Sequence, residues 1–188
     1  LSLLQVQMRD LDGYKETRHQ LLISRPTQRA SWLGYAIALH LKKQYTDAVQ
    51  VITRYEKTQV TTGEADLKKR DYEAGELVLY KAKIMFDDKK HEEALSYLAE
   101  HELQIADERA LRQLQANLLI AMNEMSQAEV LYRRMLDENR ENHDLYSGLE
   151  TCLGITGATP QADRLAIYTE YRTKYPKAHA PQLLPLFF

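Results

Sequence analysis

SWLGYAIALHLKKQYTDAVQVI, residues 31–52, is the stretch that decides the fold of this chain. In its first half, apolar side chains between Leu33 and Leu41 recur at the spacing of one helix face. The polar segment KKQY interrupts the pattern. TDAVQVI then resumes it, with Asp47 in the first turn, where a negative charge suits the helix dipole. The stretch predicts two antiparallel helices that are joined by a tight turn.

Small residues repeat this pattern along the chain. Three pairs of alanines are each separated by twelve residues: Ala36 and Ala48, Ala82 and Ala94, and Ala116 and Ala128. Weaker copies centre on Thr17 and Arg164. A small residue is needed where two helices approach most closely, because a larger side chain would push them apart. The alanines therefore predict the contact points of successive helix pairs.

The spacing of the copies is typical of the tetratricopeptide repeat, a unit of two helices. Ala94 and Ala128 are 34 residues apart, and Trp32 precedes Ala48 by sixteen residues, as in the consensus of that repeat. An aromatic or apolar residue one turn away fills the groove beside each contact. We expect nine residues to form the repeat core: Trp32, Ala36, Tyr45, Ala48, Ala82, Ala94, Ala116, Ala128 and Tyr132.

The predicted fold class is all-α, a tetratricopeptide-repeat superhelix of antiparallel helix pairs. Repeat units are expected at 1–27, 28–58, 71–106, 107–141 and 142–177, with an inter-repeat loop at 59–70. The chain begins in what reads as the middle of a helix and ends on the apolar run LLPLFF. Both ends are therefore expected to be truncated, and 1–188 to be a fragment of a longer array.

The composition of the chain argues against several classes of function. The 188 residues carry a net charge of −2, so the chain has no general attraction for nucleic acid or anionic lipid. The basic cluster at 68–70 is the best local candidate for an acidic or RNA partner. Cys152 is the only cysteine, which excludes a disulfide scaffold and favours a reducing, cytoplasmic location. No apolar run approaches the roughly 20 residues needed to span a bilayer.

Motifs for chemistry are incomplete. HEEAL begins like a zinc-protease motif at His91, but Leu95 stands where the second histidine ligand is required. QVTTGEA, residues 59–65, is a poor match to an acetyl-CoA loop, and no phosphate-binding glycine pattern is present. Cys152 lies in an apolar run that predicts a packed thiol. The sequence therefore predicts no catalytic residue, cofactor or metal site.

An array of this kind binds partners on the concave face that its first helices form. Positions on that face predict eight protein-binding residues: Ile37, His40, Glu76, Leu79, Lys83, Phe86, Gln113 and Asn117. The mixture of apolar and polar side chains suits a protein interface.

Several longer stretches resemble the auxiliary subunit of the N-terminal acetyltransferase A complex. The resemblance begins with the first 49 residues, LSLLQVQ to YTDAV, where RPTQRASWLGYAIA lies at a repeat boundary. It continues in the same order through DYEAGELVLYKAKI, ENRENHDLYSGLE and RLAIYTEYRTKYPKAHAPQLLPLFF. Arg140 departs from the family, which tends to have proline there, and the segments at 57–73 and 154–160 are the least alike.

This resemblance implies a non-catalytic scaffold subunit. Such a subunit binds and positions the catalytic acetyltransferase, which carries the acetyl-CoA chemistry, and acts co-translationally at the ribosome. The ribosome contacts are expected in parts outside this fragment, and no DNA or membrane contact is implied.

Two alternatives remain open from the residues. The chain could be a generic peptide- or chaperone-binding tetratricopeptide module, although only Asn117 matches the carboxylate clamp of chaperone-binding repeats. An enzyme would require turnover or cofactor binding by this chain alone.

Overall fold

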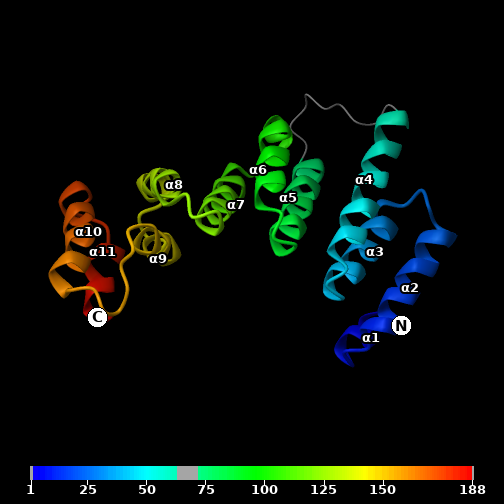
Figure 1. The fold of residues 1–188 in the computed structure, drawn as a ribbon, viewed down its shortest axis with the longest axis horizontal. Helices are drawn as coiled ribbons and strands as arrows, with labels where there is room; N and C mark the ends of the chain where they lie inside the picture. The colour runs from blue at the N-terminus through cyan, green and yellow to red at the C-terminus, as the bar shows by residue number, and fades with distance from the viewer. Residues whose placement is uncertain (1, 63–71, 188) are drawn as a thin grey trace. The chain divides into compact units, whose positions relative to one another are not determined.

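The computed structural model describes residues 2–62 and 72–187, and every regular element in these ranges is a helix (Figure 1). The predicted all-α fold class is therefore confirmed. The basic cluster at 68–70 lies outside the described residues. The chain divides into two compact units, an N-terminal unit, Leu1–Ala106, and a C-terminal unit, Asp107–Phe188, which are described separately.

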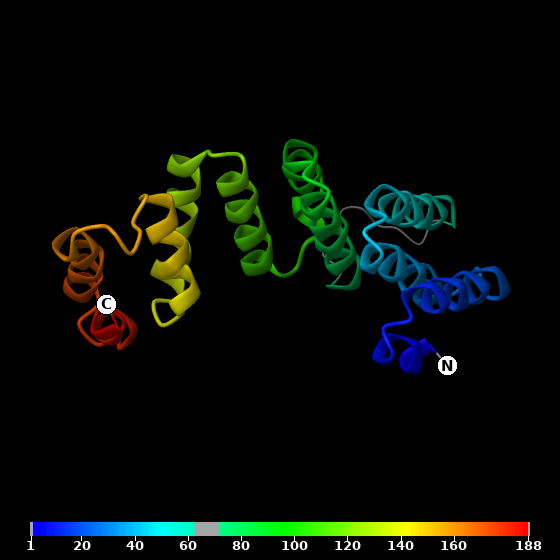
Figure 2. The same ribbon diagram turned by 60° about the horizontal axis from the view of Figure 1, so that its bottom comes forward.

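The N-terminal unit contains six α-helices and a short 3-10 helix in its described residues. They are α1 (Ser2–Gln7), α2 (Leu11–Ser24), α3 (Arg29–Leu41), α4 (Tyr45–Thr62), α5 (Tyr72–Asp87), α6 (His91–Glu100) and η1 (Glu102–Gln104). Helices α3 and α4 form the antiparallel pair expected from residues 31–52, and α5 pairs with α6 (Figure 1, Figure 2).

The C-terminal unit contains five α-helices and a final 3-10 helix in its described residues. They are α7 (Glu108–Ala121), α8 (Met125–Glu138), α9 (His143–Cys152), α10 (Gln161–Lys174), α11 (Ala180–Leu183) and η2 (Leu184–Phe187). Helices α7, α8 and α9 lie side by side in both views (Figure 1, Figure 2).

The six paired alanines are all buried, as expected for residues at the contacts between paired helices. Each of them has 0% of its surface exposed. Large side chains one turn later on the second helices, Ile52, Leu98 and Tyr132, are also buried. The helices can approach closely because the alanine methyl groups are small, and the larger neighbours fill the space beside each contact.

Three corresponding turns join the helices of these pairs, and each contains one residue with a left-handed backbone. Lys43, Lys89 and Asn123 have φ of 59°, 61° and 64°, and each lies five residues before the buried alanine of the second helix. In each turn, two backbone N–H groups donate to carbonyls of the preceding helix at 2.8–3.0 Å. This hydrogen-bonded helix end is usually built with glycine or asparagine. Here two of the three positions are lysine.

Trp32 and Tyr45 lie at the edge of the repeat core. Both are partly buried against the cluster of buried side chains between α3, α4 and α5. The indole Nε1 of Trp32 donates to the carbonyl of Pro26 at 2.7 Å, and its ring centroid lies 6.1 Å from that of Tyr55. Trp32 therefore ties the segment before α3 to α4.

The start of the predicted loop at 59–70 is helical. Helix α4 continues to Thr62, so the loop prediction is wrong for residues 59–62, and 63–70 lie outside the described residues. The extra length between Ala48 and Ala94 and the polar composition of this segment both favour a loop, but a polar stretch can also continue a helix whose exposed face is already polar.

A buried ion pair connects three helices of the N-terminal unit. Lys81 of α5 is 5% exposed, and its Nζ lies 2.6 Å from Oε2 of Glu56 in α4. The hydroxyl of Tyr97 in α6 donates to Oε1 of the same carboxylate at 2.7 Å, and Lys81 Nζ lies 4.4 Å from the centroid of the Tyr97 ring. Burial, and next the Glu56 charge, raise the pKa of Tyr97. The carboxylate therefore has two partners from the neighbouring helix pair.

Candidate functional site

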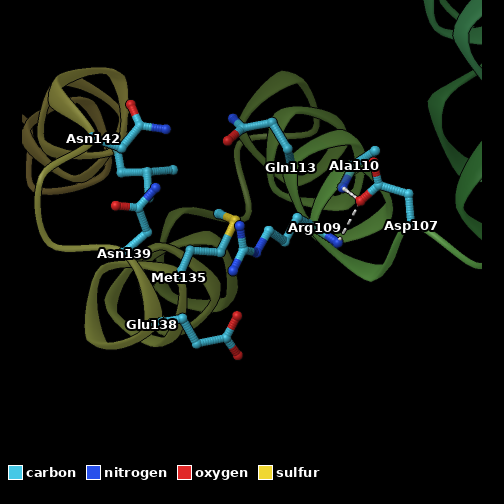
Figure 3. A pocket seen from close by; sticks show the side chains of 9 residues that line it. Asp107, Arg109, Ala110, Gln113, Met135, Glu138, Asn139 and Asn142 are labelled. Carbon is cyan, nitrogen blue, oxygen red and sulfur yellow. Dashed lines mark hydrogen bonds between the residues drawn. The ribbon is translucent and has the colours of Figure 1, made fainter.

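A cleft of about 310 Å³ lies where α7, α8 and α9 meet in the C-terminal unit (Figure 3). Its walls come from the start of α7 (Arg109, Ala110, Gln113), the end of α8 (Met135, Glu138, Asn139) and the start of α9 (Asn142, Leu145). The buried faces of Met135 and Leu145 form its apolar part, with 5% and 4% of their surfaces exposed. The remaining walls are mostly polar.

Two helix N-caps shape the cleft. Oδ1 of Asp107 accepts from the backbone N–H groups of Arg109 at 3.1 Å and Ala110 at 3.0 Å. Oδ1 of Asn142 accepts from the N–H of Asp144 at 3.0 Å. Capping satisfies N–H groups that have no partner inside the helix, so α7 and α9 both begin at the cleft.

Gln113 and Asn117, two of the predicted binding residues, are linked to the repeat core. Gln113 Nε2 donates to Asn117 Oδ1 at 3.3 Å and to the hydroxyl of Tyr132 at 3.2 Å. The Tyr132 hydroxyl in turn donates to Asn117 Oδ1 at 3.0 Å. The network leaves Gln113 Oε1 directed toward the cleft, where the Gln113 and Asn142 amides point toward one another (Figure 3).

The other six predicted binding residues lie in the N-terminal unit. Ile37, Glu76 and Lys83 are exposed, and Phe86 is half-buried with its ring 5.3 Å from that of His91. Leu79 is buried in the fold with 9% of its surface exposed, so little of its side chain is available to a partner. Leu79 lies on the side of α5 that faces neighbouring helices. The spacing of apolar residues within one helix does not show whether such a side faces other helices or a partner. That the eight predicted residues form one binding surface stays a prediction.

His40 joins α3 to α5. Its Nδ1 lies 3.0 Å from the hydroxyl of Tyr80, and its Nε2 lies 2.9 Å from Oδ2 of Asp87. Burial, with smaller contributions from Tyr14 and Asp87, raises the pKa of Tyr80 to about 12. Both ring nitrogens of His40 therefore have partners within the fold, on side chains of α5.

A second cleft, of about 390 Å³, lies between the α8–α9 connection and the end of α10. The Arg140 guanidinium lies 4.4 Å from the centroid of the Tyr175 ring, and Lys174 pairs with Asp137 at 2.6 Å. The Glu141 carboxylate accepts the backbone N–H groups of two residues at the start of α11, each at 2.9 Å. These polar side chains of the second cleft therefore already have partners in the fold, and Glu141 uses its carboxylate to hold the start of α11.

The hydrogen bonds to Glu141 predict a pH-dependent contact. The N–H groups of His179 and Ala180 lower the pKa of Glu141, because they stabilise the charged carboxylate. The contact is therefore fully present above the unfolded pKa of about 4.3 and is lost as pH falls through the lower folded pKa. An NMR titration should show the His179 and Ala180 amide protons shifting with a midpoint below about 4.3.

Glu141→Gln provides the control for this titration. The variant should lose the acidic transition at both amides. A midpoint at or above the ordinary glutamate value in the unsubstituted chain would contradict the prediction.

Arg109, Asn139 and Asn142 were not predicted as site residues. Their only sequence signal is the pair of capping residues at the starts of α7 and α9, and such residues mark helix ends in most proteins. The cleft results from three helices coming together.

The described residues, 2–62 and 72–187, also bear on metal binding and on membrane insertion. Within these ranges, no group of three His, Cys, Asp or Glu side chains could hold a metal ion. Among the same residues, no helix is both long enough and apolar enough to cross a bilayer. Cys152 is buried, and this burial raises the pKa of its thiol.

Comparison with known proteins relates most of the chain to one family. Residues 72–188 match the family model described as N-terminal acetyltransferase A, auxiliary subunit. Human N-alpha-acetyltransferase 16, NatA auxiliary subunit, is 41% identical over 186 residues, which cover 99% of this chain and 21% of that protein. The chain therefore spans about a fifth of the length of the curated relatives it matches.

Solved structures agree with this relation. A chain from the structure of Naa15/Naa10 bound to HypK-THB is 36% identical, with a TM-score of 0.81, over 98% of this chain and 27% of that one. A tetratricopeptide repeat protein from Parabacteroides merdae matches 94% of this chain and 64% of that one, with a TM-score of 0.63 and 12% identity. The second likeness shows the repeat fold alone.

Proposed function

Because the chain belongs to the N-terminal acetyltransferase A auxiliary-subunit family, we propose that it is part of a non-catalytic subunit that binds and positions the catalytic subunit of a protein N-terminal acetyltransferase complex. The family match over residues 72–188 carries this proposal. The relative with a TM-score of 0.81 is itself named as a Naa15/Naa10 complex, which supports a protein partner for this chain.

The proposal extends to where the protein acts. We place it in the cytoplasm, where the complex acts on nascent chains at the ribosome. The chain is about a fifth of the length of its curated relatives, so we assign the ribosome contacts to other parts of the protein. The exposed side chains among the predicted binding residues, Ile37, Glu76 and Lys83, are offered as part of the partner surface.

Co-expression tests the function. The full-length protein should elute from a sizing column in a stable complex with the small acetyltransferase encoded in the same genome. That complex should transfer acetyl groups from acetyl-CoA to N-terminal peptides, and the auxiliary protein alone should not. Calorimetry of the 188-residue chain with acetyl-CoA should give no heat of binding.

Two outcomes would overturn the proposal. Turnover by the auxiliary protein alone would make it an enzyme. Failure to form a complex with the acetyltransferase, together with tight binding of chaperone C-terminal peptides, would favour the generic peptide-binding module.

A further inference from the structure

The α7–α8–α9 cleft contains a cation, Arg109, that has no partner among residues 2–62 and 72–187. The Arg109 side chain extends from α7 into the cleft (Figure 3). Its guanidinium makes no hydrogen bond or ion pair with any residue in the described part of the chain. A guanidinium has five donors in a planar fork, a geometry that matches a carboxylate through two parallel hydrogen bonds. The cleft therefore offers a recognition group that the fold itself does not use.

The two carboxylates beside Arg109, those of Glu138 and Asp107, form hydrogen bonds with other groups. Glu138 receives both of its hydrogen bonds from Arg112 Nη1, at 2.7 and 2.8 Å. Asp107 caps α7 through its backbone contacts at 3.0 and 3.1 Å. The two acids nevertheless make the rim unfavourable for a ligand with several negative charges, because like charges repel at short range. The rim thus favours a ligand with a single negative charge over a phosphate group.

The amides around Arg109 match a polypeptide backbone. Asn139 has no side-chain hydrogen bond to another described residue, and Asn142 uses only its Oδ1, which leaves its NH₂ group free. Gln113 uses only its NH₂ group, which leaves its Oε1 free to accept. The cleft therefore presents both donors and acceptors, which is the combination that peptide N–H and C=O groups require.

The apolar part of the cleft suits the stem of an acidic side chain. Met135 and Leu145 form its buried surface, next to the small side chain of Ala110. The methylene groups of a glutamate can lie against such a surface while its carboxylate reaches Arg109.

We propose that this cleft binds one acidic side chain of an extended segment of a partner protein, with Arg109 as the residue that recognises the carboxylate. Asn139, Asn142 and Gln113 hold the backbone of that segment. This assignment concerns a site in the C-terminal unit and does not depend on the acetyltransferase partner proposed above.

NMR with a defined peptide tests the site. The ¹⁵N-labelled 188-residue chain is titrated with N-acetyl-Ser-Glu-Ser-amide, with its Gln analogue, and with inorganic phosphate. The Glu peptide should give saturable shifts at the side-chain amides of Asn139 and Asn142. The Gln analogue should bind about tenfold more weakly, because a charge-assisted hydrogen bond is lost.

Variants assign the effect to the guanidinium. Arg109→Gln should weaken binding of the Glu peptide about tenfold and abolish the preference for Glu over Gln. Arg109→Lys keeps the charge without the planar fork and should bind with intermediate affinity. Arg172→Gln, which changes an exposed arginine of α10 outside the cleft, should bind as the unsubstituted chain does. Arg109 is exposed, so its substitution should leave the fold intact. Unchanged backbone spectra of the variants will confirm this.

Several results would overturn the inference. They are the absence of saturable shifts, equal binding of the Glu and Gln peptides, binding that Arg109→Gln does not change, and tighter binding of inorganic phosphate than of the Glu peptide at the same residues. The last result would assign the cleft to phosphate groups.

Discussion

Replacing Glu56 with alanine is expected to lower the free energy of unfolding of the N-terminal unit by about 3 kcal/mol. The change would leave the Lys81 ammonium, whose side chain is 7% exposed, without its counter-charge, and the Tyr97 hydroxyl without its acceptor. Breaking a fully buried pair costs about 3–5 kcal/mol. We expect the lower end of this range because the Glu56 side chain is 27% exposed and can be partly solvated.

The partner substitution should be much milder. Lys81→Met preserves the volume of the side chain, and the Glu56 carboxylate keeps its hydrogen bond to Tyr97 and its access to solvent. The double variant Glu56→Leu with Lys81→Met should recover most of the loss, since neither buried charge remains. A larger loss of stability in Glu56→Ala than in Lys81→Met would therefore show that the cost comes from an unpaired buried charge and not from lost packing.

Urea unfolding followed by tryptophan fluorescence can measure these changes. Trp32 is the only tryptophan and belongs to the N-terminal unit, so the signal reports on that unit. Glu76→Ala, which removes an exposed carboxylate from α5, is the matched control and should change stability by less than about 0.5 kcal/mol. If Glu56→Ala were as mild as this control, the ion pair would contribute little to the fold.

The second large effect is expected at Gly148 in α9. A Cβ atom at this position would lie 2.2 Å from ring carbon Cε1 of Tyr132, far inside van der Waals contact. Tyr132 is 2% exposed and is held by Gln113 and Asn117, so its ring cannot move aside. Overpacking of this kind costs about 1–3 kcal/mol, and the gain in helix propensity over glycine offsets up to about 1 kcal/mol.

We therefore expect Gly148→Ala to destabilise the C-terminal unit by about 1–2 kcal/mol. Amide hydrogen exchange should show the loss of protection in α8 and α9. Gly157→Ala is the control, because no atom lies within 4 Å of a Cβ placed there. Equal protection in the two variants would mean that the α8–α9 contact has room for a methyl group.

The helix pairs could be predicted from the sequence because their requirements are local. A small residue must lie at each close contact, and the contact recurs after a fixed number of residues, so Ala48, Ala94 and Ala128 mark three second helices. The same reasoning missed the left-handed backbone of Lys43 and Lys89, because neither residue type carries a turn signal. Hydrogen bonding at the helix ends, together with packing of the pair, imposes that conformation.

The sequence by itself determined the all-α class, the positions of the helix pairs and the family, since these depend on residue spacing and on ordered likeness along the chain. Only the tertiary structure decided which polar groups have partners. It buried Leu79, paired Lys81 with Glu56 and placed Arg109 in a cleft built from three helices, where no residue of the described ranges pairs with it. Partner choice depends on distances between residues far apart in the chain, and the pattern within one helix does not contain those distances.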